Sequence, residues 1–89
     1  MNLIWATKAW NDYVEWQTQS EQITAKINDL IADFRGNPFT GIGKPEPLRG
    51  NLTGWWARRI SDEHRLVYRI TGKRGVDQRI EIAHCRFHY

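Results

Sequence analysis

The side chains best suited to chemistry in this sequence are one carboxylate, several arginines and a terminal His-Tyr pair. Glu46 lies between two prolines, Arg59 and Arg65 lie in segments rich in apolar residues, and His88 and Tyr89 end the chain. RNA carries its own nucleophile, the 2′-hydroxyl, so a protein that cleaves it needs a base, a group that stabilises phosphoryl charge and an acid. Glutamate, arginine, histidine and tyrosine together can supply these functions without a metal.

These residues can be given separate roles in such a reaction. Glu46 is a candidate base and His88 a candidate acid. Arg65, with Arg59 beside it, could stabilise the extra charge on the phosphorus oxygens. Tyr89 could donate a hydrogen bond or stack on a base. The sequence therefore contains one candidate for each step of RNA transesterification.

Each of these residues also has a purely structural interpretation. Glu46 could be a solvated loop acid, and Arg65 could pair with Glu63 or Asp62. His88 could be a solvated residue at the end of the chain. From residue types alone, both interpretations stay open.

Other chemistries find less support. The three histidines have no zinc-ligand spacing, and one cysteine cannot complete a thiolate site. Cys85 is expected to be a small core residue, and His64 and His84 are expected to be structural. Gly41 and Gly43 lack the rest of a phosphate-binding loop motif. We therefore expect no metal and no cofactor.

Length and composition predict one small domain over residues 1–89. The hydrophobic fraction is 40%, with five Trp, three Tyr and three Phe, which suits a packed core rather than disorder. A single cysteine, with neither a signal-peptide pattern nor a membrane-length apolar run, suits a protein of a reducing cytosol. Charge is uneven: residues 1–40 carry a net −2 and residues 41–89 a net +5. The C-terminal half is therefore the candidate polyanion-binding part, although ordinary solvated charge explains the asymmetry equally well.

Periodicity predicts the elements that must position these side chains. Residues 2–5 suit a strand, and helical spacing predicts a helix to about Gln17, with Thr7 as its N-cap. A capping box at residues 18–21 then starts a second helix, which Gly36 and Pro38 end. The two helices should form an antiparallel hairpin with an apolar, core-facing stripe. Trp5, Trp10 and Trp16 are expected in that core or in a subunit contact.

The C-terminal half is predicted to be β-structure. Residues 55–60 and 64–71 alternate as two strands of a hairpin, which places Arg59, Arg65 and Arg69 on a polar face opposite the helices. A third strand from residue 79 is expected to run to the C-terminus and to be central or bulged, because both its faces carry apolar residues. The fold class is therefore α+β, with an N-terminal helical hairpin packed on one face of a twisted antiparallel sheet.

The segment 36–54 has five Gly, three Pro and no periodicity, so it is predicted to be a long loop. Its prolines stiffen the backbone around Glu46 and could aim that side chain at a site. Lys44 and Arg49 lie in the same segment.

Five segments closely resemble the YoeB (Txe/YoeB) toxins of the RelE/ParE superfamily, and the likeness spans essentially the whole chain in order and spacing. They are residues 1–5 (MNLIW), 43–48 (GKPEPL), 52–60 (LTGWWARRI), 63–68 (EHRLVY) and 85–89 (CRFHY). The resemblance implies a RelE/ParE-like fold. It also implies a ribosome-dependent endoribonuclease that cuts mRNA in the 30S A site, against 16S rRNA, and so inhibits translation.

The resemblance also assigns residue roles. Glu46 looks like the general base, His88 like the general acid, Arg65 like the phosphate stabiliser, and Tyr89 like the terminal tyrosine that orients substrate. Further basic residues fall where the family faces RNA or the ribosome: Lys44, Arg49 and Arg59.

The family further implies protein partners. These are a YefM-like antitoxin whose C-terminal segment wraps the toxin, operator DNA bound only through the antitoxin complex, and a second copy in a homodimer. No membrane partner is expected. The alternative function within the same fold is that of ParE-type relatives, which inhibit DNA gyrase by binding it without nuclease chemistry. A non-catalytic RNA-binding module is a third possibility, in which Glu46→Ala would keep its toxicity.

The turn at residues 72–78 departs from the familiar family pattern, because it is longer and more basic. Lys73 and Arg74 lie in this turn, and an added contact to ribosomal RNA is our hypothesis for them.

Overall fold

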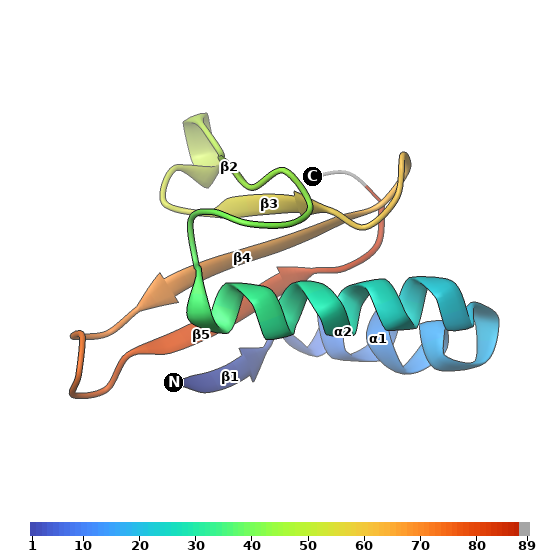
Figure 1. Ribbon diagram of the computed structural model, residues 1–89, viewed down its shortest axis with the longest axis horizontal. Coiled ribbons are helices and arrows are strands. Elements are labelled where there is room, and N and C mark those ends of the chain that lie inside the picture. The colour runs from blue at the N-terminus through green and yellow to red at the C-terminus, as the bar shows by residue number, and fades with distance from the viewer. Residues whose placement is uncertain (88–89) are drawn as a thin grey trace.

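The chain folds into two helices on one side of a five-stranded sheet (Figure 1). The structure, a computed structural model, describes residues 1–87. In chain order the elements are β1 (Asn2–Trp5), α1 (Thr7–Gln19), α2 (Glu21–Gly36), β2 (Glu46–Pro47), η1 (Gly50–Leu52), β3 (Trp56–Arg59), β4 (Arg65–Thr71) and β5 (Arg79–His84). The predicted α+β class with a helical hairpin on one face of the sheet is confirmed.

The two helices differ from the prediction at their ends. Helix α1 continues to Gln19, and its N-cap is Ala6 rather than Thr7, without a side-chain hydrogen bond. The predicted capping box at residues 18–21 is wrong, because the N-cap of α2 is Ser20, whose hydroxyl accepts from the Ile23 N–H at 3.1 Å. A cap two residues later leaves the two helices almost continuous in sequence. No helix of residues 1–87 is long and apolar enough to span a membrane.

The sheet has the order β1-β5-β4-β3-β2. The pairs β2–β3, β3–β4 and β4–β5 are antiparallel, as predicted. Strand β1 instead pairs with β5 in parallel, with Asn2 opposite Arg79, so the sheet is mixed. The prediction of an antiparallel sheet is wrong for this pair, because the sequence of a short apolar strand does not indicate whether its partner runs parallel or antiparallel.

The last strand is both central and bulged, as its two apolar faces predicted. It lies between β1 and β4. Val67 pairs with His84 and Tyr68 with Ile82, so Ala83 is an extra residue in β5. The expectation that this strand reaches the C-terminus is wrong: β5 ends at His84, and the next residues bend away, with Phe87 at a left-handed φ of 61°.

The main core lies between the helices and the sheet. Its fully buried side chains include Ile27, Leu30 and Phe34 of α2 and Ile80 and Ile82 of β5. The apolar stripe of the second helix therefore faces the sheet, as predicted.

Of the three N-terminal tryptophans, only Trp16 is buried. Trp5 packs partly against the core, whereas Trp10 is 47% exposed and lies edge-on to Trp5, with ring centroids 5.7 Å apart. The prediction of a core role thus holds for Trp16 and in part for Trp5.

The segment 36–54, predicted as a loop without structure, contains both β2 and η1. Glu46 and Pro47 pair with Ala57 and Trp56 and form one edge of the sheet. Proline suits an edge strand because it has no N–H to donate to a further neighbour. Glu46 is therefore fixed to the sheet by backbone pairing rather than carried on a free loop.

Candidate functional site

The face of the sheet opposite the helices, called here the helix-free face, carries a row of aligned side chains. Glu46 of β2 is opposite Ala57 of β3, Ala57 is opposite Val67 of β4, and Val67 is opposite His84 of β5. Directly paired residues project on the same face. Ala57 and Val67 are buried in a small apolar cluster with Leu48 on this face, and Glu46 lies exposed at one end of the row.

Two arginines adjoin this row. Arg59 and Arg65 are directly opposite each other across the β3–β4 ladder. Arg59 is two residues along from Ala57, which makes it a diagonal neighbour of Glu46 at about 7–8 Å between backbones. Like charges directly opposite each other destabilise a sheet, and an anion placed between them removes that repulsion. The arrangement suits a phosphodiester group beside the Glu46 carboxylate.

The alternative pairing of Arg65 with Glu63 or Asp62 is not found. The Arg65 Nη1 instead donates to backbone carbonyl oxygens of the preceding turn, at 2.7 Å to Ser61 and 3.1 Å to Asp62. Carbonyl oxygens orient a guanidinium without neutralising its charge. Within residues 1–87, Arg59 and Arg65 form no ion pair with an acidic side chain.

The backbone before Glu46 is held tightly against β3. The Arg59 N–H donates to the Gly43 carbonyl at 2.7 Å, which places Lys44 beside the same end of the strand. Gly43 has a φ of +80°, and a Cβ there would lie 2.6 Å from the Leu30 side chain, so only glycine fits. Lys44 follows with a left-handed φ of 50°, uncommon for a residue with a side chain.

Arg58 anchors the same segment from the core side of the sheet. Its side chain is fully buried. Its guanidinium donates to the Asp33 carboxylate at 2.5 Å and to the carbonyl oxygens of Asn37, Thr40 and Ile42. Residues 37–42, which have no regular structure, are thereby attached to the sheet, and the Tyr68 hydroxyl of β4 adds a hydrogen bond to the Pro38 carbonyl at 2.6 Å.

The electrostatics of this anchor follow from its contacts. The hydrogen bond from Arg58 holds the pKa of Asp33 below its usual value. Tyr68, whose hydroxyl accepts from the Arg58 Nε at 3.0 Å, has its pKa raised by burial. Asp33 is therefore charged and Tyr68 neutral at physiological pH, which is the state that balances a buried guanidinium.

Hydrogen bonds to α1 and to the start of β4 hold the segment that leads to the C-terminus. Phe87 N–H donates to the His64 Nδ1 at 2.8 Å, and the Phe87 carbonyl accepts from the Arg65 N–H at 3.1 Å. The Trp16 indole N–H donates to the Cys85 carbonyl at 2.9 Å. These bonds place the chain beside Arg65 immediately before His88 and Tyr89, two predicted site residues that lie outside the described part of the chain.

The other predicted basic residues are dispersed. Arg49 lines a shallow depression with Glu46. Arg69 lies on the helix-free face, as predicted. Its Nη2 lies 2.8 Å from the Glu81 Oε1, and its Cζ lies 4.4 Å from the centroid of the Trp55 ring. Exposed Lys73 and Arg74 lie beyond the far end of β4 from Arg65. The structure thus brings together Lys44, Glu46, Arg59 and Arg65, with Arg49 nearby.

Residues 1–87 contain no group of three or more His, Cys, Asp or Glu side chains placed to hold an ion. The residues of this site are suited to holding a phosphate by charge and hydrogen bonding.

Comparison with known proteins identifies the family. Residues 5–89 match the family described as YoeB-like toxin of bacterial type II toxin-antitoxin system. The chain belongs to this family. Toxin YoeB of Escherichia coli (strain K12) is 53% identical over 89 residues, with both chains covered completely.

Solved structures of YoeB proteins have the same fold. The YoeB/ParE toxin from Agrobacterium tumefaciens is 50% identical, with a TM-score of 0.95 and both chains covered fully. YoeB from Staphylococcus aureus is 41% identical in its dimer structure and 40% in its complex with YefM, with TM-scores of 0.86 and 0.87. In both cases 100% of this chain and 98% of that chain are covered. The resemblance to the YoeB toxins noted from the sequence is confirmed.

Two residues of this YoeB-like chain that matter to the site were not singled out from the sequence. Arg58 was one of several arginines in an alternating strand, and only its position on the core-facing side, beside Trp56 and Ile60, could have marked it as buried. His64 was expected to be structural, which its 7% exposure and bond to Phe87 confirm, but its connection to the C-terminal segment was not foreseen.

Proposed function

We propose that this YoeB-like toxin is a ribosome-dependent endoribonuclease that cleaves mRNA in the A site of the 30S subunit and so inhibits translation. The observation that carries the proposal is the position of Glu46 beside the opposed pair Arg59 and Arg65 on the helix-free face. A carboxylate next to two guanidiniums that lack carboxylate partners within residues 1–87 suits base catalysis on a bound phosphodiester.

The proposed reaction is a transesterification that uses the RNA's own 2′-hydroxyl. Glu46 accepts the hydroxyl proton as the 2′-oxygen bonds to phosphorus, and Arg65 with Arg59 stabilises the charge of the phosphorane. The bond from phosphorus to the 5′-oxygen breaks, and His88 donates a proton to that oxygen. Tyr89 orients the substrate. The products are a 2′,3′-cyclic phosphate and a 5′-hydroxyl, so the reaction needs neither a metal nor water in its first step.

Basic residues around this centre are proposed to contact the nucleic acids of the A site. Lys44 and Arg49 adjoin Glu46 and suit the mRNA or 16S rRNA backbone. Arg69 is already engaged with Glu81 and Trp55, so its proposed contact to RNA would add to an existing structural role. Lys73 and Arg74 extend the basic surface at the other end of β4.

We infer the protein partners from the relatives. The Staphylococcus aureus YoeB has been solved both as a dimer and with YefM. By likeness, this chain forms a homodimer in the bacterial cytoplasm and is neutralised by a YefM-like antitoxin, and it contacts operator DNA only through that complex.

The function is tested on purified ribosomes programmed with a short mRNA, with a parallel mRNA that carries a 2′-deoxy sugar at the cut position. The protein is expected to cleave only the ordinary mRNA, in the A-site codon. Glu46→Gln is expected to lower the single-turnover rate by about 10²–10⁴-fold. Glu21→Gln removes an exposed acid at the start of α2 and is the matched control, expected to cleave at the unaltered rate.

Cleavage of the deoxy mRNA would contradict attack by the 2′-hydroxyl. Failure of the folded protein to cleave either mRNA would overturn the nuclease proposal and favour gyrase inhibition, the ParE-type alternative. Undiminished cleavage by Glu46→Gln would remove Glu46 from the proposed mechanism.

A further inference from the structure

A second basic site lies at the other end of the β4–β5 hairpin. Two adjoining pockets, of about 640 and 430 Å³, open between the C-terminal end of α2 and the turn that connects β4 to β5. They share Met1, Arg35, Gly36 and Gln78. Strand β4 separates this turn from Arg65 by six residues, or about 20 Å at the usual rise. The pockets therefore lie apart from the proposed catalytic centre.

The charge of the site is positive. Arg35 and Arg74 line it, and Lys73 adjoins Arg74 in the turn. Within residues 1–87, none of these three cations lies within ion-pair distance of an acidic side chain. The C-terminal carbonyls of α2 contribute only about half a negative charge, which two guanidiniums outweigh. The site is thus suited to an anion.

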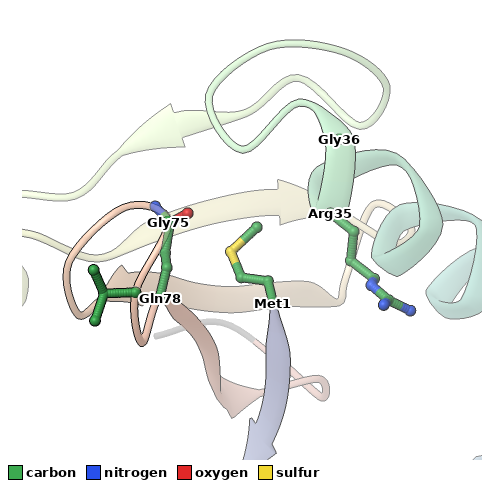
Figure 2. Close-up of a pocket in the computed structure, with 6 residues that line it drawn as sticks. Met1, Arg35, Gly36, Gly75 and Gln78 are labelled. Atoms are coloured by element: carbon green, nitrogen blue, oxygen red, sulfur yellow. The ribbon is translucent and has the colours of Figure 1, made fainter.

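Figure 2 shows how the residues of the larger pocket are arranged. Met1 lies between Gly75 and Gln78 of the turn and Arg35 of α2, and the Arg35 guanidinium is directed away from the turn. Arg35 is exposed at the end of its helix and can turn toward a ligand by changing rotamer. Exposed Arg35 thus lies on the helix side of both pockets, and Arg74 lies on the turn side of the smaller one.

An exposed aromatic ring adjoins these cations. Phe39 lines the smaller pocket and is 50% exposed. Its ring lies against that of Trp56, with the ring centroids 4.9 Å apart and the ring planes inclined at 42°. Aromatic rings beside arginines are the usual platform for unstacked RNA bases.

The turn that carries Arg74 is ordered by its own hydrogen bonds. The Asp77 carboxylate accepts from the Lys73 N–H at 2.7 Å, and the Lys73 carbonyl accepts from Val76 N–H at 3.0 Å. Gly72 has a φ of +84°, and a Cβ there would lie 2.4 Å from the Asp77 carbonyl oxygen. The single acid of the turn thus fixes its backbone, and the basic side chains extend from a defined support.

We propose that the smaller pocket binds one nucleotide of single-stranded RNA, with the phosphate on Arg35 and Arg74 and the base stacked on Phe39. The Gln78 amide adds a donor and an acceptor for the base edge. The choice of RNA as the ligand rests on the proposed function, whereas the choice of a phosphate and a base rests on the pocket. The nucleotide comes either from ribosomal RNA or from the mRNA outside the A-site codon.

The test measures equilibrium binding of the full chain in a Glu46→Gln background, in which cleavage is expected to be slow. The ligands are empty ribosomes, programmed ribosomes and a free RNA oligonucleotide, each over a series of salt concentrations. The double variant Arg35→Gln/Arg74→Gln removes both guanidiniums. Lys8→Gln/Lys26→Gln makes the same charge change elsewhere on the helices and is the control. Phe39→Leu removes the stacking ring but keeps apolar contact with Trp56, and Phe39→Tyr restores a ring.

The arginine double variant is expected to bind about tenfold more weakly than the control, with the slope of log affinity against log salt reduced by about 0.7 for each lost phosphate contact. Phe39→Leu is expected to weaken binding by at least about fivefold without changing that slope, and Phe39→Tyr to restore it. Weaker binding to empty ribosomes assigns the nucleotide to ribosomal RNA, whereas an effect confined to programmed ribosomes or the oligonucleotide assigns it to mRNA.

Equal binding by the arginine variant and its control would overturn the pocket proposal, as would unaltered binding by Phe39→Leu. A DNA oligonucleotide of the same length is measured as well. If the arginine variant bound this DNA more weakly but bound every RNA ligand as the control does, the proposal would be overturned too. The proposed function fails separately, by absence of cleavage in the protein with Glu46 intact.

Discussion

The imidazole Nδ1 of His64 accepts a hydrogen bond from the Phe87 N–H at 2.8 Å, across 23 residues of sequence. The His64 ring is buried edge-on against Trp16, with centroids 4.8 Å apart, so its position is set by the core. Phe87 is held by this bond in a left-handed conformation that L-residues seldom adopt. A core histidine thus fixes the direction of the chain just before the proposed acid His88.

Replacing His64 is therefore expected to affect cleavage more than folding. His64→Leu loses the acceptor and should destabilise the protein by about 1 kcal/mol. Single-turnover cleavage at saturating ribosomes should fall by about 10²-fold, because a displacement of about 1 Å at a catalytic group has that effect. His64→Asn keeps an acceptor near the Nδ1 position and should recover much of the rate. Equal rates for the Leu and Asn variants would contradict this positioning role.

Arg58 is expected to be the arginine on which stability depends most. Arg58→Met removes every hydrogen bond that ties residues 37–42 to β3 and should lower the free energy of unfolding by about 3 kcal/mol. Arg59→Met, its neighbour on the helix-free face, should change that free energy by less than about 0.5 kcal/mol. Urea unfolding of both variants measures the difference. Similar losses would show that the buried network contributes no special stability.

The Asp33–Arg58 pair predicts a loss of stability in acid. The pKa of Asp33 is lowered in the folded protein, so its contribution is complete above the unfolded value of about 3.9 and is lost as the pH falls through the lower folded pKa. The gap in unfolding free energy between the protein and Asp33→Asn should therefore shrink on acidification below about pH 4. Asp29→Asn, at an exposed position on α2, is the control. A gap independent of pH would be evidence against this linkage.

Cys85 is predicted to be chemically inert in the folded state. Burial raises the pKa of its thiol to about 12, and its Sγ contacts the Ala9 carbonyl oxygen at 3.3 Å. An ordinary thiol has a pKa near 8.5, so at mildly alkaline pH the folded protein should react with a disulfide reagent on the order of 10³-fold more slowly than the unfolded chain. Absorbance of the released thiol measures both rates. Comparable rates would mean that the segment after β5 opens readily.

The fold could be predicted well where periodicity was long and plain. The second helix and the β3–β4 hairpin have clear periods of 3.6 and 2, so their faces and the side of Arg59, Arg65 and Arg69 were foreseen. The direction of β1 could not be predicted, because four residues carry no information about a partner more than 70 positions away. Strand β2 could not be predicted either, because it has only two residues and one of them is a proline.

The site could be predicted in its residue types more than in its geometry. The prolines around Glu46 indicated a stiff backbone, but its pairing with Ala57 is a long-range contact that local sequence does not show. Arginines look alike in sequence, and only burial separates Arg58 from Arg59 and Arg69. The anchoring of Phe87 by His64 depends on the bend after β5, where the strand was expected to continue.

The parallel pairing of β1 with β5 joins the first strand to be synthesised to the last. Asn2 is opposite Arg79, and β5 lies inside the sheet with its buried Ile80 and Ile82. A nascent chain that lacks residues 79–84 can neither complete this sheet nor close the core beneath it. A protein proposed to act on ribosomes thus acquires its folded form only after β5 has been translated. The order of the strands in the sheet therefore makes the proposed activity depend on the synthesis of β5.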